Sequence, residues 1–89
     1  MRELFLEGGF KKDLKLAQKR RLKLDKLWEI VEQLQKGKSL APKHRPHRLS
    51  GKWARFWECH IEPDWLLVYA LTDDGLILVR TGTHSDLFG

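Results

Sequence analysis

Polar and apolar residues alternate with the period of an α-helix in two stretches, residues 10–21 and 24–36. The first stretch is interspersed with lysines, and a tight break near residues 21–23 would let the two helices pack side by side and antiparallel. Gly37 is well placed to end the second helix. The apolar stripes consist of Phe10, Leu14 and Ala17 in the first helix, and Leu24, Leu27, Trp28, Val31 and Leu34 in the second.

Apolar residues elsewhere follow the pattern of β-strands. The pair Asp74-Gly75 lies between two apolar runs, which is typical of a hairpin turn. We predict three sequential antiparallel strands in the second half and one short strand near the start, closed by Gly8 and Gly9. The segments concerned are residues 2–6, 53–61, 65–71 and 76–80.

These elements predict an α+β fold, in which two N-terminal helices cover one face of a small antiparallel sheet. The other face is then available for a site. The tail after residue 80 has room for one turn of helix at most. We expect one domain over residues 1–89, because 89 residues leave no room for a second core.

Charge is distributed unevenly along the chain. Residues 1–52 carry 15 Lys/Arg against 6 Asp/Glu, a net charge of +9, whereas residues 53–89 carry 2 against 6, a net charge of −4. The stretch 39–52 lacks periodicity and is a basic loop that includes Lys43, Arg48 and Lys52. This asymmetry predicts a polyanionic partner, either nucleic acid or an acidic protein segment; a solvated lysine-rich helix face is the alternative.

Cysteine content and the N-terminus bear on the compartment. A single cysteine, Cys59, excludes an internal disulfide and suits a reducing cytosol. Acids lie where a signal peptide would have its apolar core, and no apolar run approaches ~18 residues. The sequence therefore predicts a cytoplasmic protein without a membrane partner.

Several side chains with chemical potential lie near the ends of the predicted strands. His47 is in the basic loop, His60 and Asp64 flank the turn between the first two strands of the meander, and His84 follows the last strand. A meander brings such positions together at one end of the sheet. Neighbours along a strand point to opposite faces, so His60 should share a face with Glu58 while Cys59 fills the core.

Three kinds of function could use these residues. Zinc could bind to histidines and an aspartate, but the spacings of 13 and 24 residues between His47, His60 and His84 match no metal motif. RNA could be cleaved without metal by attack of its own 2′-OH, with histidines moving protons and Arg80 and the loop lysines holding the phosphate. The third possibility is a basic RNA- or protein-binding module without catalysis.

The chain also resembles a known family. The blocks His-x-Glu-Pro-Asp-Trp at residues 60–65 and Arg-Thr-Gly-Thr-His at 80–84, with the neighbouring residues 47–53 and the opening Phe-Lys-Lys-Asp-Leu-Lys at 10–15, are similar to the YafQ-type toxins of the RelE superfamily. These are the toxin halves of type II toxin–antitoxin pairs. The resemblance implies a RelE-like microbial RNase fold and a metal-independent endoribonuclease that cuts mRNA at the ribosome and inhibits translation, with no cofactor.

Site residues and partners follow from this resemblance. It implies a cognate antitoxin, commonly of ribbon–helix–helix type, that wraps the toxin and gives the pair its contact with operator DNA. We expect His84 and Asp64 to be the principal proton-transfer pair, and His47 and His60 to position the scissile phosphate or share a proton role. Phe88 either orients a base or ties down the tail. The predicted RNA and phosphate ligands are Arg80, Lys52, Arg48 and Lys43.

The sequence departs from the family pattern at two places. Leu6-Glu7-Gly8-Gly9 precedes Phe10 where Ser or Thr is usual, and Arg21-Leu22-Lys23 replaces a break that usually contains glycine. Neither place belongs to the expected site.

Overall fold

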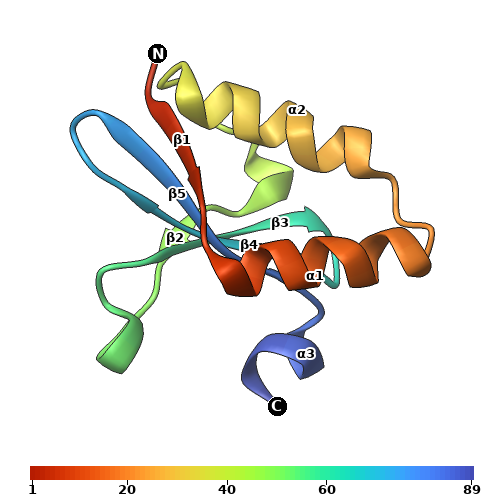
Figure 1. Cartoon of the computed structure of the whole chain (residues 1–89). Helices are drawn as coiled ribbons and strands as arrows, with labels where there is room; N and C mark the ends of the chain where they lie inside the picture. Colours follow the sequence, from red (N-terminus) through yellow and green to blue (C-terminus); the bar gives the residue numbers. More distant parts are fainter.

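The computed structural model describes residues 1–89 and has a five-stranded sheet with helices on one side (Figure 1). The strand order across the sheet is β1-β5-β4-β3-β2. This arrangement confirms the predicted α+β class. The elements are β1 (Glu3–Leu6), α1 (Gly8–Lys19), α2 (Leu24–Gln35), β2 (His47–Arg48), β3 (Trp57–Glu62), β4 (Trp65–Leu71), β5 (Gly75–Gly82) and α3 (His84–Phe88), with short 3-10 turns η1 (Pro42–His44) and η2 (Gly51–Trp53) in the basic loop.

Helix α1 begins two residues earlier than the sequence predicted. Gly8 and Gly9 form its first turn instead of closing the strand before it. A Cβ atom at Gly9 would lie 3.0 Å from Cδ of Arg80, so the absence of a side chain lets the helix approach β5.

No helix of the structure is long and apolar enough to span a membrane.

Helix α2 presents a slightly different face to the core than its predicted stripe. Ile30 is buried with the expected Leu27, Val31 and Leu34, whereas Trp28 is 36% exposed. The observed set follows the i, i+3, i+4, i+7 spacing from Leu27, which turns Trp28 toward the rim. There its ring meets Phe10 of α1 edge-on, with 6.3 Å between ring centroids.

Both long helices end in the same hydrogen-bonded turn. After α2, Gly37 adopts a φ of +72°, and the N–H groups of Gly37 and Lys38 donate to carbonyl groups of the last turn. After α1, Arg21 takes the corresponding position with a φ of +58°, and the N–H of Leu22 donates to the carbonyl of Ala17 at 3.1 Å. An arginine therefore adopts a left-handed conformation that normally favours glycine.

The meander of β3, β4 and β5 is antiparallel, as predicted, and the sheet extends beyond it on both sides. β1 joins one edge by pairing with β5 in parallel, from Glu3 opposite Gly75 to Leu6 opposite Leu78. β2 joins the other edge, antiparallel to β3. Neither addition could be read from the sequence, because a four-residue run does not reveal its partner and a two-residue strand has no periodicity.

The core lies between the helices and one face of the sheet. Cys59 is fully buried in it, and burial, aided by the neighbouring Glu58 carboxylate, raises the pKa of its thiol to about 12. The predicted role of Cys59 as a core residue is therefore confirmed, and the thiol stays protonated at neutral pH. The other buried residues of this core include Phe10, Leu27, Ile30, Val31, Ile61, Trp65, Leu67, Tyr69, Leu76 and Leu78.

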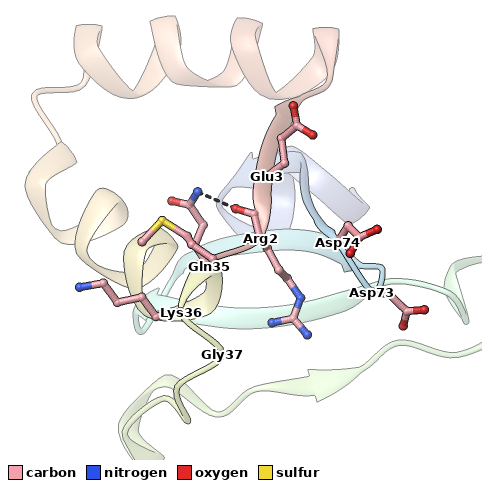
Figure 2. Close-up of a pocket in the computed structure, with 8 residues that line it drawn as sticks. Arg2, Glu3, Gln35, Lys36, Gly37, Asp73 and Asp74 are labelled. Carbon is pink, nitrogen blue, oxygen red and sulfur yellow. Dashed lines mark hydrogen bonds between the residues drawn. The ribbon is translucent and has the colours of Figure 1, made fainter.

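Arg2 fixes the start of β1 to two other elements. Its backbone N–H donates to the carbonyl of Gln35 at 2.9 Å, and the amide of Gln35 donates back to the Arg2 carbonyl at 3.0 Å (Figure 2). The Arg2 Nε atom also donates to the carbonyl of Thr72. The open pocket around these residues lies beside the β4–β5 turn, at the opposite end of β4 and β5 from the histidines.

Replacing Arg21 by glycine should stabilise the protein. A left-handed conformation costs an L-residue about 1–2 kcal/mol, and glycine avoids this cost. Glycine also loses more conformational entropy on folding, which offsets part of the gain. We therefore expect a net increase of about 1 kcal/mol in the free energy of unfolding. Arg21→Ala removes the same charge but keeps the Cβ atom and should not reproduce the gain. Urea denaturation of both variants tests this; equal stability of the two would contradict it.

Candidate active site

The end of the sheet where β3 turns into β4 is also the end where β5 finishes. Gly82, the last residue of β5, pairs with Leu66 near the start of β4, so the chain enters α3 beside the β3–β4 turn. This connection brings His84 close to His60, with 5.8 Å between their ring centroids. Figure 1 shows α3 at the opposite end of β5 from the β4–β5 hairpin turn.

Asp64 holds His84 through a single carboxylate oxygen. Its Oδ1 atom accepts the backbone N–H of His84 at 3.0 Å and lies 2.7 Å from the ring Nδ1. These two hydrogen bonds, the backbone one first, keep the pKa of Asp64 below its usual value although the carboxyl is exposed. An ionised Asp64 makes Nδ1 the protonated ring nitrogen, which leaves Nε2 of His84 to exchange protons with a substrate.

The other two site histidines are oriented in the same way by backbone carbonyl groups. Nδ1 of His47 lies 2.9 Å from the carbonyl of Arg45, and Nδ1 of His60 lies 3.2 Å from the carbonyl of Pro63. In each ring the Nδ1–H is thereby engaged, and Nε2 is directed elsewhere. The predicted convergence of His47, His60, Asp64 and His84 is what the structure shows.

A buried carboxylate joins this group, and the sequence reasoning did not include it among the site residues. Glu58 is 5% exposed, and its Oε1 atom lies 3.4 Å from Nε2 of His47 and 4.0 Å from Nε2 of His60. Pairing of His47 with Glu58 across β2 and β3 sets the first contact. The available signal was the strand parity that put Glu58 on the face of His60.

Phe88 packs against η2 instead of lying free in the tail. Its ring meets Trp53 edge-on with 5.9 Å between centroids, and Trp53 in turn meets Phe56. Phe88 nevertheless remains 46% exposed. The tail is therefore docked on η2, and one part of the ring stays open to a ligand.

Helix α3 is fixed by a network centred on Asp86. The Asp86 carboxylate accepts the backbone N–H of Thr83 and two hydrogen bonds from the guanidinium of Arg20, the residue that caps the C-terminus of α1, at 2.6 and 3.2 Å. The side chain of Thr83 accepts the backbone N–H of Asp86 in return, which completes a capping box. A Cβ atom at Gly82 would lie 3.0 Å from Asp86, so glycine is needed for this approach.

Arg80 does not lie free at the site. Its Nε and Nη2 atoms donate to the two carboxylate oxygens of Asp13 in α1, at 2.6 and 3.1 Å, and this contact raises the pKa of Arg80. The same carboxylate also accepts the backbone N–H of Thr81 at 3.0 Å. Asp13 thus covers the edge of β5 beyond the end of β1, and the charge of Arg80 is offset.

The predicted basic ligands of the loop occupy different places. Lys43 lines a pocket that includes His60. Arg48 lies over the ring of Trp57 and donates to the carbonyl of Ala54, away from that pocket. Lys52 is exposed on η2, in the 3-10 turn that carries Trp53, to which Phe88 docks.

The sequence matches the family model described as "Bacterial toxin of type II toxin-antitoxin system, YafQ" over residues 2–89. The chain belongs to the YafQ toxin family. The mRNA interferase toxin YafQ of Escherichia coli K12 is 42% identical over 89 residues, which cover 99% of this chain and 97% of that protein.

Solved structures of similar toxins have the same fold. YafQ in the Escherichia coli DinJ–YafQ complex superposes with a TM-score of 0.92 at 41% identity, over all of both chains. A copper-bound mutant toxin from Helicobacter pylori superposes with a TM-score of 0.95 at 43% identity, over 99% of this chain and 100% of that one. The fold implied by the family resemblance is thus confirmed, and at the helix break Arg21 supplies the backbone conformation expected of glycine.

A set of metal donors exists within the site. One oxygen of Glu58 and one ring nitrogen each of His60 and His84 lie within 4.8 Å of one another. A carboxylate with two imidazoles is a suitable donor set for a transition metal such as zinc or copper. Sequence spacing could not reveal this set, because its members come from β3 and α3 and meet only through the fold.

Acid should loosen α3 from the rest of the protein. Hydrogen bonds hold the folded-state pKa values of Asp64 and Asp86 below the unfolded value of about 3.9. Their contribution to stability is therefore complete above about pH 4 and is lost as the pH falls through the folded-state values. We expect the NMR signals of Phe88 and Trp53 to shift in this range.

Two variants provide the controls for this titration. Asp86→Asn cannot titrate and should flatten the response of the Phe88 ring, whereas Asp73→Asn, in the distant β4–β5 turn, should leave it unchanged. Phe88 signals that stay constant as pH falls below about 3 in the unmodified protein would contradict the assignment.

Proposed function

We propose that this protein is a toxin endoribonuclease that cleaves mRNA by general acid–base chemistry, without a metal ion, and so inhibits translation. The observation that carries the proposal is the contact between Asp64 and His84, which leaves Nε2 of an exposed histidine available beside the imidazole of His60. Family membership and the mRNA interferase relative at 42% identity support the same activity. Residues 1–89 would act as one toxin domain in the cytoplasm.

The chemistry requires two proton transfers. One group removes the proton of the RNA 2′-OH, the 2′-oxygen bonds to the adjacent phosphorus, and the bond to the 5′-oxygen breaks as that oxygen takes a proton. The products are a 2′,3′-cyclic phosphate and a free 5′-OH. His84 with Asp64 performs one transfer, and the histidines around Glu58 perform the other, since their Nε2 atoms lie near the same carboxylate.

The basic residues around the cluster would hold the phosphate groups of the bound RNA. Lys43 and Lys52 have no ion-pair partner within the chain, and Arg48 lies in the same loop. Asp13 engages Nε and Nη2 of Arg80, so Nη1 is the atom of that guanidinium that would contact a phosphate oxygen. The exposed part of Phe88 would orient a base by stacking.

Removing either member of the principal pair should abolish most of the activity. His84→Ala and Asp64→Ala should each lower the cleavage rate by about 10²–10⁴-fold and relieve growth arrest when the toxin is expressed alone. Asp73→Ala, an exposed aspartate at the far end of the sheet, serves as the matched control and should cleave normally. If the two site variants remain folded and fully toxic, the assignment is wrong.

The donor set of Glu58, His60 and His84 favours metal-assisted cleavage as a second candidate. Copper-bound and metal-bound toxins from Helicobacter pylori are similar to this chain at 43% and 41% identity. A bound ion would supply a Lewis acid for the phosphate oxygen. Chelator sensitivity separates the two routes, and a protein that binds RNA but cleaves none under any condition would instead be a non-catalytic binding module.

The partners follow from the charge distribution and the family. We propose a cognate antitoxin of ribbon–helix–helix type that wraps the toxin, with operator DNA bound only through the antitoxin, and mRNA in the ribosome as the substrate. The Escherichia coli relative has been solved with DinJ. The net charge of +9 on residues 1–52 supports an anionic partner.

The antitoxin should present acidic residues to the basic half of the toxin. Toxin–antitoxin association should then slow as ionic strength rises, because electrostatic steering is screened by salt. Stopped-flow association between about 0.05 and 0.5 M salt tests this. A toxin-binding segment with net positive charge, or an association rate that does not depend on salt, would argue against it.

A further inference from the structure

A polar pocket lies beside His60. It is formed by η1 and the residue after it, by the end of β3, and by one lysine of α2, and it encloses about 440 Å³. That volume falls within the range of small-ligand sites. His60 lines this pocket and also takes part in the histidine cluster, so the pocket adjoins the proposed reaction centre.

The charge of the pocket favours an anion. Lys26, Lys43 and Arg45 contribute cations, and Glu62 is the one acid among the lining residues. Glu62 is already engaged, with 3.2 Å between its Oε2 atom and Nζ of Lys26. The side chains of Lys43 and Arg45 make no hydrogen bond or ion pair within the chain, which leaves two cations to meet a ligand.

The wall that carries these two cations is fixed to the catalytic strand. Nδ1 of His44, in η1, lies 2.7 Å from the carbonyl of His60. Arg45 follows with a left-handed backbone, φ +44°, and its N–H donates to Pro42 while its carbonyl holds the ring of His47. The guanidinium of Arg45 therefore extends from a backbone position that also orients a proposed catalytic histidine.

We infer that this pocket binds the RNA phosphate next to the scissile one, with Lys43 and Arg45 as its ligands. The inference rests on the proposed function. An RNA strand whose scissile phosphate contacts His84 and His60 continues past His60, and the pocket supplies two unpaired cations at the next position. A neighbouring phosphate held there would fix the register of the strand at the cleavage centre, which makes the pocket a positioning subsite for single-stranded RNA.

The variant Lys43→Ala/Arg45→Gly tests the subsite. Glycine preserves the left-handed backbone that orients His47 while removing the guanidinium. The matched control is Lys12→Ala/Lys15→Ala, which removes the same charge from exposed positions of α1. Binding is measured by fluorescence anisotropy with a short RNA that carries a 2′-deoxy residue at the cleavage position, so that no cleavage is needed.

The subsite variant should reduce the slope of log affinity against log salt by about 1.4, as expected for two lost phosphate contacts on a single strand. The control should change the slope by less, because the two α1 lysines that it removes make no direct contact with the RNA. With cleavable RNA the subsite variant should raise KM by a larger factor than it lowers kcat, because the lost contacts bind the strand in both the ground state and the transition state. Equal slopes for the two double variants, or a loss confined to kcat, would overturn the inference.

A neutral methylphosphonate linkage locates the contact along the strand. The unmodified protein should lose affinity when one of the two linkages flanking the cleavage position is neutral, and the subsite variant should be insensitive to that change. If the variant instead loses affinity for poly-glutamate while its RNA binding is unchanged, the pocket serves an acidic protein segment and the inference fails. If the salt slopes and the methylphosphonate effect are as expected but the protein does not cleave ordinary RNA, the proposed function is refuted and the subsite is not.

Discussion

The contact between Asp64 and His84 is the interaction on which the proposed site depends. One carboxylate oxygen takes up both the backbone N–H and the ring of His84, and so joins the β3–β4 turn to the first residue of α3. The contact can form only because Asp86, Thr83 and Arg20 hold α3 in place. The β3–β4 turn and the short helix α3 thus cooperate to orient one imidazole.

The sequence allowed the helices, the meander, the hairpin turn and the convergence of four site residues to be predicted, because each depends on local periodicity or on strand order. Strand parity also placed Cys59 in the core and His60 opposite it. The sequence could not show β1 beside β5, the start of α1 at Gly8, or the Asp13–Arg80 pair, since these depend on which distant elements meet. Strand parity put Glu58 on the face of His60, but its contact with His47 depends on the pairing of β2 with β3, so Glu58 was missed as a site residue.

A common arrangement unites the histidines of the site. In His47, His60 and His84 the Nδ1 atom lies beside a carbonyl or carboxylate oxygen, and Nε2 is left for other contacts. The acceptors come from the basic loop and from the β3–β4 turn, so the rings are oriented by the ordinary backbone geometry of those segments. The same loop places unpaired cations beside His60, so in the proposed mechanism the residues that position RNA and those that transfer protons are held by the same segments.

The chemical form of the RNA fragments released in the presence of excess chelator tests the proposed mechanism most directly. Proton transfer by histidines, with attack by the RNA's own 2′-OH, predicts undiminished cleavage that leaves 2′,3′-cyclic phosphate and 5′-OH ends, and no cleavage at a linkage preceded by a 2′-deoxy residue. Loss of cleavage on chelation that returns with added metal, or fragments with 5′-phosphate ends from water attack, would contradict it.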